Sequence, residues 1–230
     1  MSLSRETTTN LRLHIIAIAL LGCTSLAQPS SPGLTPLKTS LPKPVFVGTP
    51  RVIVAPNLER VTGKLRTAPR VPGGTRNLAA GRPVTGSDPK PFVGRYAMVT
   101  DGNKEATGNS FLELAPGPQW IQIDLGKRAV IHGVLLWHYH SEARVYHDVI
   151  VHLGNSPDGM ETRQPVFNND HDNSSKLGMG TDKEYIETFE GRFIPVRGHQ
   201  GRFIRLSSNG NTTDDMNDYV EVEVFGVPVP

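Results

Sequence analysis

Residues 120–126 read Trp-Ile-Gln-Ile-Asp-Leu-Gly, with apolar side chains at every second position from Ile121 to Leu125 and polar ones at Gln122 and Asp124. A period of two places the apolar side chains on one face of an extended chain and the polar ones on the other. The stretch therefore predicts a β-strand that buries one face.

The same kind of pattern recurs along the second part of the chain. Alternating runs occupy 148–153, 202–206 and 220–225, and a longer β-branched and aromatic run occupies 130–137. Turn-forming sequences separate the runs, and no window has the period of an amphipathic helix. Many short strands divided by turns predict an all-β, antiparallel β-sandwich for residues 76–230.

Charge divides the 230 residues into two parts. Residues 1–75 carry 9 Lys and Arg against 2 Asp and Glu, whereas residues 76–230 carry 15 against 20. An acidic globular part is poorly suited to a groove that binds phosphates, so we expect no nucleic-acid partner. The single cysteine, Cys23, excludes an internal disulfide and a thiolate zinc cluster.

The first 23 residues have the features of an export signal. Arg5 and Arg12 precede a short apolar run at 15–21, which is too short to cross a bilayer as a helix. The last four residues, Leu-Leu-Gly-Cys, resemble a bacterial lipobox, which would make Cys23 the lipidated first residue of the mature chain. This resemblance implies an exported protein, lipid-anchored in the bacterial cell envelope at the outer membrane or cell surface. The alternative is an ordinary signal cut near residues 25–27, which discards Cys23.

Residues 24–75 are rich in proline and basic side chains, and Phe46 is their only aromatic residue. So few bulky groups predict a disordered, semi-extended tether, because they offset little chain entropy. Its Lys and Arg side chains could lie along an anionic membrane or glycan surface, or serve only for solubility. One apolar cluster within 44–55 could add an edge strand.

Five motifs of the globular part resemble, in order, the discoidin or coagulation factor 5/8 type C domain family. They are Asn77-Leu78-Ala79 with Pro83-Val84-Thr85, Val99 to Asn103, Trp120 to Gly126, Arg202 to Leu206, and Glu221 to Gly226. The resemblance implies a galactose-binding-like jelly-roll sandwich. The family's usual Trp after the Asp-Gly-Asn turn is missing, since residues 108–111 read Gly-Asn-Ser-Phe. Despite this departure we expect the family's fold, but the ligands of family members cannot be assigned to this chain.

The Asp-Gly-Asn turn at Asp101 bends carbonyl and side-chain oxygens around one point, as a hard cation needs. Taken alone, the sequence favours an ordinary Asx turn over a cation site. The family resemblance implies a structural calcium site formed by Asp101, Asn103, Thr107 and Glu221. Glu223 stands two residues further on the same strand face, so it is the alternative to Glu221.

A second group of candidate residues follows in the sequence Trp-His-Tyr-His at 137–140. His138 and His140 share a strand face and could bind zinc or copper, yet no third ligand stands at a typical spacing. Imidazole and guanidinium donors beside an aromatic ring suit sugar recognition, which makes His138, His140 and Arg144 candidate ligand-binding residues. The alternative is a structural network in which Arg144 pairs with Asp148 or another carboxylate.

The third group lies in a polar loop that reads Asn-Asn-Asp-His-Asp-Asn. It is not an EF-hand, because Ser175 stands where that loop needs a glycine. Its side chains Asn168, Asp170 and Asp172 suit a polyhydroxylated ligand or a second cation, and the alternative is a self-bonded turn. The loop 209–215 allows the same two interpretations.

The chain contains no Gly-x-Ser-x-Gly elbow, no phosphate-cradling glycine loop and no His-Glu-x-x-His motif. We therefore expect a non-catalytic carbohydrate-binding module, tethered to the cell envelope, that binds a glycan or polysaccharide through loops at one end of the sandwich. The alternatives are an adhesion or scaffold protein with an envelope protein as partner, and a small glycan-active hydrolase that uses paired carboxylates such as Asp170 and Asp172.

Overall fold

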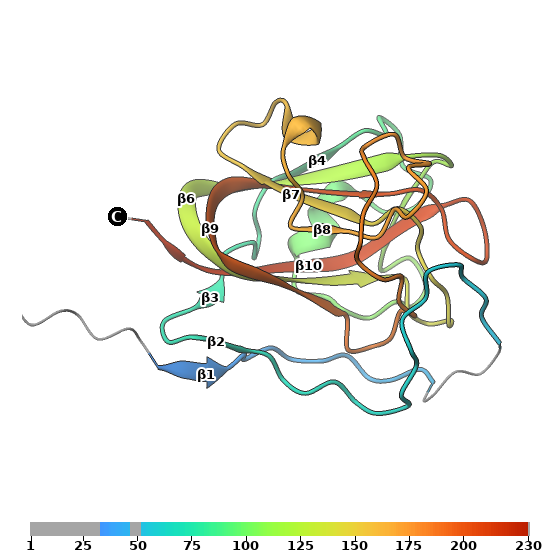
Figure 1. Cartoon of the computed structure of the whole chain (residues 1–230), viewed down its shortest axis with the longest axis horizontal. Coiled ribbons are helices and arrows are strands. Elements are labelled where there is room, and N and C mark those ends of the chain that lie inside the picture. Colours follow the sequence, from blue (N-terminus) through green and yellow to red (C-terminus); the bar gives the residue numbers. More distant parts are fainter. Residues whose placement is uncertain (1–32, 47–51, 230) are drawn as a thin grey trace, which may run out of the picture. The chain divides into compact units, whose positions relative to one another are not determined.

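The computed structural model describes residues 33–46 and 52–229, and these form an almost entirely β structure (Figure 1). Strands and two short 3-10 helices follow one another in this order: β1(Leu34–Pro36), β2(Arg70–Pro72), β3(Arg76–Asn77), β4(Val84–Gly86), η1(Tyr96–Thr100), β5(Leu112–Leu114), β6(Gln119–His138), β7(Ile150–Gly154), η2(Met160–Thr162), β8(Phe167–Asn168), β9(Arg192–Ser208) and β10(Asn217–Pro228). Within these residues, no helix has the length and apolar character needed to cross a membrane.

All named strand pairs are antiparallel, which confirms the predicted fold class. The main sheet has the order β3-β10-β6-β9-β7-β8, with β4 added to β6 and β5 added to β10. Three strands are long, with 20 residues in β6, 17 in β9 and 12 in β10. Each of these long strands pairs with different neighbours along its length, so the same strands contribute to both layers of the sandwich.

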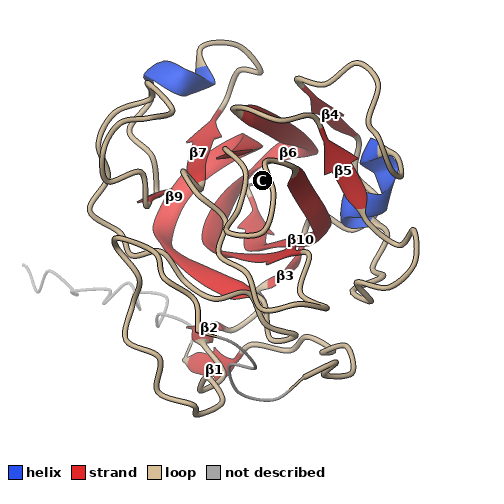
Figure 2. Ribbon diagram, turned by 90° about the vertical axis from the view of Figure 1, so that its right-hand side faces the viewer, coloured by secondary structure: helices blue, strands red, loops and turns tan. Residues whose placement is uncertain are grey.

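Strand β6 bends between the two layers. Its first part, up to Asp124, pairs with β4 and with the end of β9, and its second part, from Ala129, pairs with β10 and with the start of β9. The register shifts between these parts, at a bend where Gly126 has φ +78°. Glycine adopts this left-handed conformation without steric cost. Figure 2 shows the resulting sheet curving around the interior.

The space between the layers is apolar. The predicted inward face of residues 120–126 is confirmed, because Ile121 and Ile123 are fully buried and Leu125 is nearly so. They pack in one cluster with side chains of the opposite layer, among them Leu136 and Val222. The core therefore follows the alternation that the sequence displays.

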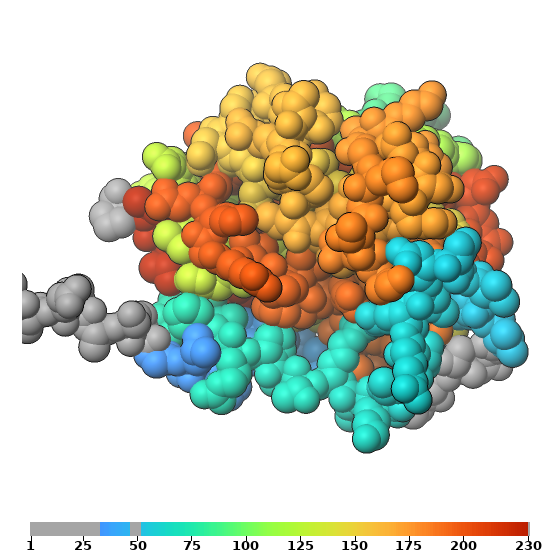
Figure 3. All heavy atoms as spheres, viewed as in Figure 1, coloured from blue at the N-terminus to red at the C-terminus, as the bar shows by residue number. Residues whose placement is uncertain are grey.

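A second apolar cluster lies on the outer face of the layer that contains β10. Leu135, Trp137 and Phe225 point outward there, and Leu37 and Val71 from the N-terminal part of the chain cover them. We call residues 33–46 and 52–75 the strap. Figure 3 shows its cyan part against the orange part of the chain that follows residue 170.

The strap differs from the free tether that its composition predicts. Its backbone is mostly irregular, with only the short antiparallel pair β1 and β2, and 44–46 and 52–55 form no strand. It is nevertheless fixed, because Thr39 Oγ1 donates to Glu223 Oε2 at 2.6 Å and Arg192 Nη1 lies 2.8 Å from Glu59 Oε2. A few apolar side chains are enough to hold the strap in place, because they pack on an apolar outer face of the sandwich. Cys23 and the expected export signal lie outside the described residues.

Candidate functional site

Three loops meet at the end of the sandwich where β6 finishes and β10 begins. They connect β6 to β7, β8 to β9, and β9 to β10. Asp148 of the first loop joins the other two, since its Oδ2 accepts hydrogen bonds from Ser174 Oγ at 2.9 Å and from Asn209 Nδ2 at 2.8 Å. The loops that the sequence singles out therefore form one surface, which we call the loop end.

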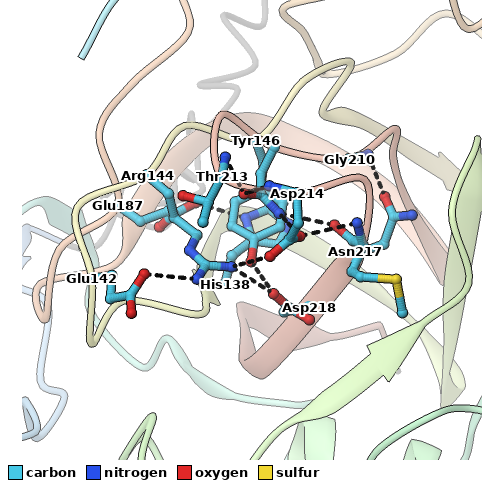
Figure 4. Close-up of polar contacts among 12 residues, drawn as sticks. His138, Glu142, Arg144, Tyr146, Glu187, Gly210, Thr213, Asp214, Asn217 and Asp218 are labelled. Atoms are coloured by element: carbon cyan, nitrogen blue, oxygen red, sulfur yellow. Dashed lines mark hydrogen bonds and ion pairs between the residues drawn. The ribbon is translucent and has the colours of Figure 1, made fainter.

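Arg144 lies at the centre of the loop end (Figure 4). Its Nη1 donates to Asp218 Oδ2 at 3.1 Å and lies 3.5 Å from Asp214 Oδ2, and its Nη2 donates to Glu142 Oε2 at 3.2 Å. The guanidinium is also stacked over the Tyr139 ring at 4.6 Å, and Arg144 is only 6% exposed. This is the structural network of the alternative interpretation, with partners other than Asp148.

Asp218 connects Arg144 to a buried aromatic stack. Tyr146 Oη donates to Asp218 Oδ2 at 2.6 Å, and the Tyr146 ring stacks on His138 at 4.2 Å. His138 Nδ1 lies 2.7 Å from Glu187 Oε1, with both side chains buried. Burial raises the pKa of Asp218, and burial and Asp218 together hold the pKa of Tyr146 well above its usual value. His138 is therefore an interior residue of this network, and its contact with a ligand remains a prediction.

His140 is also buried, and it joins two loops. Its Nε2 lies 2.9 Å from the backbone oxygen of Lys104, and Ser141 Oγ donates to the backbone oxygen of Ala106. The loop after β6 is thereby fixed to the loop that follows Asp101. A shared zinc or copper ion has no third ligand here, because the one group of three or more His, Cys, Asp or Glu side chains that could hold a metal among the described residues includes neither His138 nor His140.

Asn168 and Asp170 belong to a turn that satisfies its own polar groups. The two Asp170 carboxylate oxygens accept from the Ser174 and Ser175 amides, and Ser175 Oγ donates to Asp170 Oδ2 at 2.5 Å. Asn168 and Asp170 are buried, whereas Asp172 is exposed. Of the six side chains expected to bind ligand, Asp172 alone faces solvent. The other five are buried among protein partners, and their direct contact with a ligand remains a prediction.

Three aspartates at the loop end could hold a metal ion. Asp148, Asp170 and Asp172 each offer a carboxylate oxygen within 4.8 Å of the others. Burial raises the pKa of Asp148, and the two neighbouring carboxylates act in the same direction. Amide and hydroxyl donors from Ser174 already bind all three, so each carboxylate has a hydrogen-bond partner without an ion, although their negative charge is not neutralised.

The Asp101 turn lies against Glu221, as the family resemblance implies for a calcium site. Gly102 N donates to Glu221 Oε2 at 3.1 Å, while Glu221 Oε1 is buried with no hydrogen-bond partner among the described residues. Burial raises the pKa of Glu221 to about 8. A buried carboxylate oxygen without a donor is a group that a hard cation would satisfy. Glu223 fits less well, because its Oε1 already lies 2.8 Å from Lys104 Nζ.

The other expected calcium ligands lie at the surface of the same turn. Asp101, Asn103 and Thr107 are exposed. Asp101 Oδ1 accepts from Asn103 N at 2.8 Å, and Asn103 Oδ1 accepts from Glu105 N at 3.0 Å, so the turn is also an Asx turn. Oxygen-rich side chains beside the Glu221 carboxylate are compatible with Ca²⁺.

Sequence reasoning did not find Glu187 and Asp218 of the network, nor Lys104, whose backbone oxygen contacts His140. Each is a charged residue within or next to a largely apolar or turn sequence, which gives no sign of its partner. Only the position of Asp218 could have indicated its role, because it stands at the start of β10 and therefore near the loops of this end.

No family model and no curated protein matches this chain. Among solved structures, it is similar to the "CBM32 of AlyQ in complex with 4,5-unsaturated mannuronic acid", with 19% identity, a TM-score of 0.44 and coverage of 62% of this chain and 93% of that one. A Streptococcus pneumoniae fucose binding module gives 17% identity and a TM-score of 0.44, covering 65% of this chain and 96% of that one. A family 89 glycoside hydrolase from Clostridium perfringens gives 15% and 0.47, covering 66% of this chain but only 15% of the hydrolase chain. Scores of this size tell nothing about the ligand.

Proposed function

We propose that the protein is a non-catalytic glycan-binding module whose ligand face is the loop end. The observation that carries this proposal is the pair of exposed carboxylates that Arg144 holds in place. Glu142 and Asp214 have side-chain exposures of 56% and 41%, and each lies within 3.5 Å of the guanidinium. Fixed carboxylates beside half-buried Tyr139 offer hydrogen-bond acceptors to sugar hydroxyls.

Arg144 acts in this proposal as a positioning residue. The network beneath it, from Asp218 to His138 and Glu187, is buried and fixes the loops before a ligand arrives. Preorganisation lowers the ordering cost of binding, but a shallow polar surface gains little beyond its own desolvation. Weak binding of a neutral glycan is therefore expected, with exposed Asp172 at the edge of the same surface.

The same proposal includes a structural calcium ion at the Asp101 turn. Glu221, Asp101, Asn103 and Thr107 would hold it, and the ion would supply the positive charge that the buried Glu221 carboxylate needs. Through the Lys104 carbonyl that contacts His140, an ordered turn would also support the loop end. The three-aspartate cluster at the loop end is a second place for a cation.

We also propose that the chain is exported and lipid-anchored at Cys23 in a bacterial cell envelope. The support is the Leu-Leu-Gly-Cys sequence at 20–23 after a short apolar run. Wild-type protein would incorporate radiolabelled palmitate, and the Cys23→Ser variant would not. A soluble, unlabelled mature chain that begins after Cys23 would contradict the anchor.

A protein-binding scaffold is the second candidate, because the strap exposes apolar side chains. Val52 is 90% exposed, Val54 83% and Leu65 73%. Leu65 also lines a groove of about 410 Å³, together with residues that include Phe46 and Phe189. Exposed apolar groups next to a groove are typical of protein interaction sites.

A glycan array with the chain from residue 24 onward tests the proposed function. Wild-type protein is expected to bind at least one glycan, and the double variant Glu142→Gln with Asp214→Asn is expected to lose that binding. Asp158→Asn with Glu161→Gln makes the same charge change on the loop after β7 and is the matched control. Absence of any bound glycan would favour the scaffold, and hydrolysis of an arrayed glycan would show an enzyme.

A further inference from the structure

A basic pocket lies at the end of the sandwich opposite the loop end. Strand pairing fixes this placement, because β10 pairs Tyr219 with His138 at the loop end and Pro228 with Ala129 at the other. The pocket measures about 370 Å³, and none of the described residues that line it carries a carboxylate. Its lining residues are Arg76, Asn77, Leu78, Ala80, Arg82, Leu125, Lys127, Arg128, Ala129 and Pro228.

Three separate segments bring the four cations together. Arg76 lies in β3, Arg82 ends a turn in which its amide donates to the Ala79 carbonyl, and Lys127 and Arg128 follow the bend of β6. The bend and the turn are in contact, since a Cβ added at Gly126 would lie 2.9 Å from Arg82 Nη1. The cluster is thus a consequence of the tertiary fold, and all four cations are exposed.

In the part of the chain that the structure describes, no carboxylate forms an ion pair with any of the four cations. The charge of Arg82 helps to lower the pKa of the Asp124 carboxylate. Asp124 accepts two hydrogen bonds from Arg202, at 2.7 and 2.8 Å, and these are the main cause of its lowered pKa. Arg128 Nη2 donates to the neutral Gln200 side chain at 2.7 Å. Among the described residues, the side chains of Arg76 and Lys127 form no ion pair.

We propose that the basic pocket binds a phosphate or other oxyanion carried on a larger molecule. Guanidinium groups match oxyanions through paired N–H donors, and Lys127 adds a point charge. Leu78, Leu125 and Ala129 add apolar groups to the lining, against which the body that carries the anion can pack. The same chemistry is present in soluble phosphate compounds and in phospholipid headgroups. The site is independent of glycan binding at the loop end.

Thermal unfolding in inorganic pyrophosphate tests the site, with sodium chloride at equal ionic strength as reference. A ligand that binds only the folded state raises the melting temperature. We expect the rise in wild type, and an apparent affinity at least about tenfold weaker in the double variant Arg82→Gln with Lys127→Gln. The control Lys90→Gln with Arg95→Gln removes the same charge outside the pocket and should behave as wild type.

Vesicles distinguish the two sources of the anion. Co-sedimentation with phosphatidylcholine vesicles containing phosphatidylglycerol, compared with pure phosphatidylcholine, uses the same three proteins. Pocket-dependent binding to the anionic vesicles identifies a lipid headgroup, whereas a pocket-dependent pyrophosphate effect without vesicle binding identifies a soluble phosphate compound. Responses of equal size in the pocket variant and its control, or no response to either probe, would overturn the proposal.

Discussion

Lys104 Nζ lies 2.8 Å from Glu223 Oε1, and their side chains are only 6% and 9% exposed. The ammonium also lies 3.3 Å from Thr39 Oγ1 and from Ser40 Oγ in the strap. One buried ion pair therefore joins the strap, the loop after Asp101 and the last strand. Residues far apart in the sequence depend on it for their mutual placement.

Loss of Lys104 is expected to destabilise the protein strongly. The variant Lys104→Ala leaves the Glu223 carboxylate buried without its cation, which typically costs about 3 kcal/mol or more of unfolding free energy. Urea unfolding measures the change. The matched control is Glu161→Gln, which breaks a pair with Arg205 at 48% side-chain exposure of Glu161 and should cost less than about 1 kcal/mol. Equal small losses in both variants would contradict a structural role for Lys104.

Removal of the strap should expose the outer apolar face. A chain that begins at residue 76 loses the contacts of Leu37 and Val71 with the cluster around Trp137. We expect a lower melting temperature and a red shift of tryptophan fluorescence, because Trp137 gains contact with water. In the full chain, Leu37→Ala with Val71→Ala should shift both readouts in the same direction. An unchanged emission maximum in both proteins would show that the strap does not cover this face in solution.

The alternation of apolar and polar residues predicted the strands of the sandwich well. The composition of the strap did not predict that it packs on the sandwich. Alternation at Ile121 and Ile123 is a property of neighbouring residues, so the sequence displays it directly. The burial of Leu37 depends on an apolar face that Leu135 and Trp137 present about a hundred positions later. Composition alone therefore suggests a solvated tether, although these few side chains have a surface to cover.

The sequence predicted that the loops of the candidate site meet, but not which of their side chains are exposed. Loops between strands at one end must meet, which brings Arg144, Asp148 and the Asn168 loop together. A polar side chain is buried where a partner such as Asp218 or Glu187 lies next to it in the fold. These partners stand far from it in the sequence, and no motif spacing relates the two positions. Hence five of the six expected ligand side chains proved to be internal.

Calcium removal tests the Asp101 turn. Chelator should lower the melting temperature of wild type, because a cation bound only to the folded state stabilises it by mass action. Glu221→Gln should reduce this response, since it removes the buried charge that the ion would neutralise. The control Asp172→Asn alters the three-aspartate cluster instead. If Asp172→Asn abolishes the response while Glu221→Gln keeps it, the cation belongs to the loop end.

The His147 and Glu184 pair should make stability depend on pH. His147 Nδ1 lies 2.9 Å from Glu184 Oε1, and this hydrogen bond raises the pKa of His147. Burial raises the pKa of Glu184, but the bonds from His147 and from Asn57 N outweigh it and leave the value lowered. The histidine contribution is fully present below about pH 6.5 and is lost as pH rises through the higher folded value, whereas the carboxylate contribution is lost in acid.

Wild type should therefore exceed His147→Gln in stability by up to about 1 kcal/mol near pH 5.5, with the difference shrinking toward pH 8. Urea midpoints across this range measure it. His199→Gln is the control, because His199 is exposed and has no such partner among the described residues. A difference that grows with pH would contradict the charged pair.

Arg144 provides the last prediction, and the structure reverses what a direct sugar contact would require. Direct contact predicts that Arg144→Ala keeps its stability and loses binding. In the structure, the guanidinium pairs with Asp218, a buried carboxylate whose other side-chain donor among the described residues is Tyr146 Oη. Arg144→Ala should therefore lose about 3 kcal/mol of unfolding free energy, and Arg144→Lys should recover part of it because the charge remains. Urea unfolding, with Glu142→Gln as the exposed control, measures these losses. If Arg144→Ala unfolds like wild type but no longer binds a glycan that wild type binds, the guanidinium itself contacts the sugar, and the positioning role proposed for it is wrong.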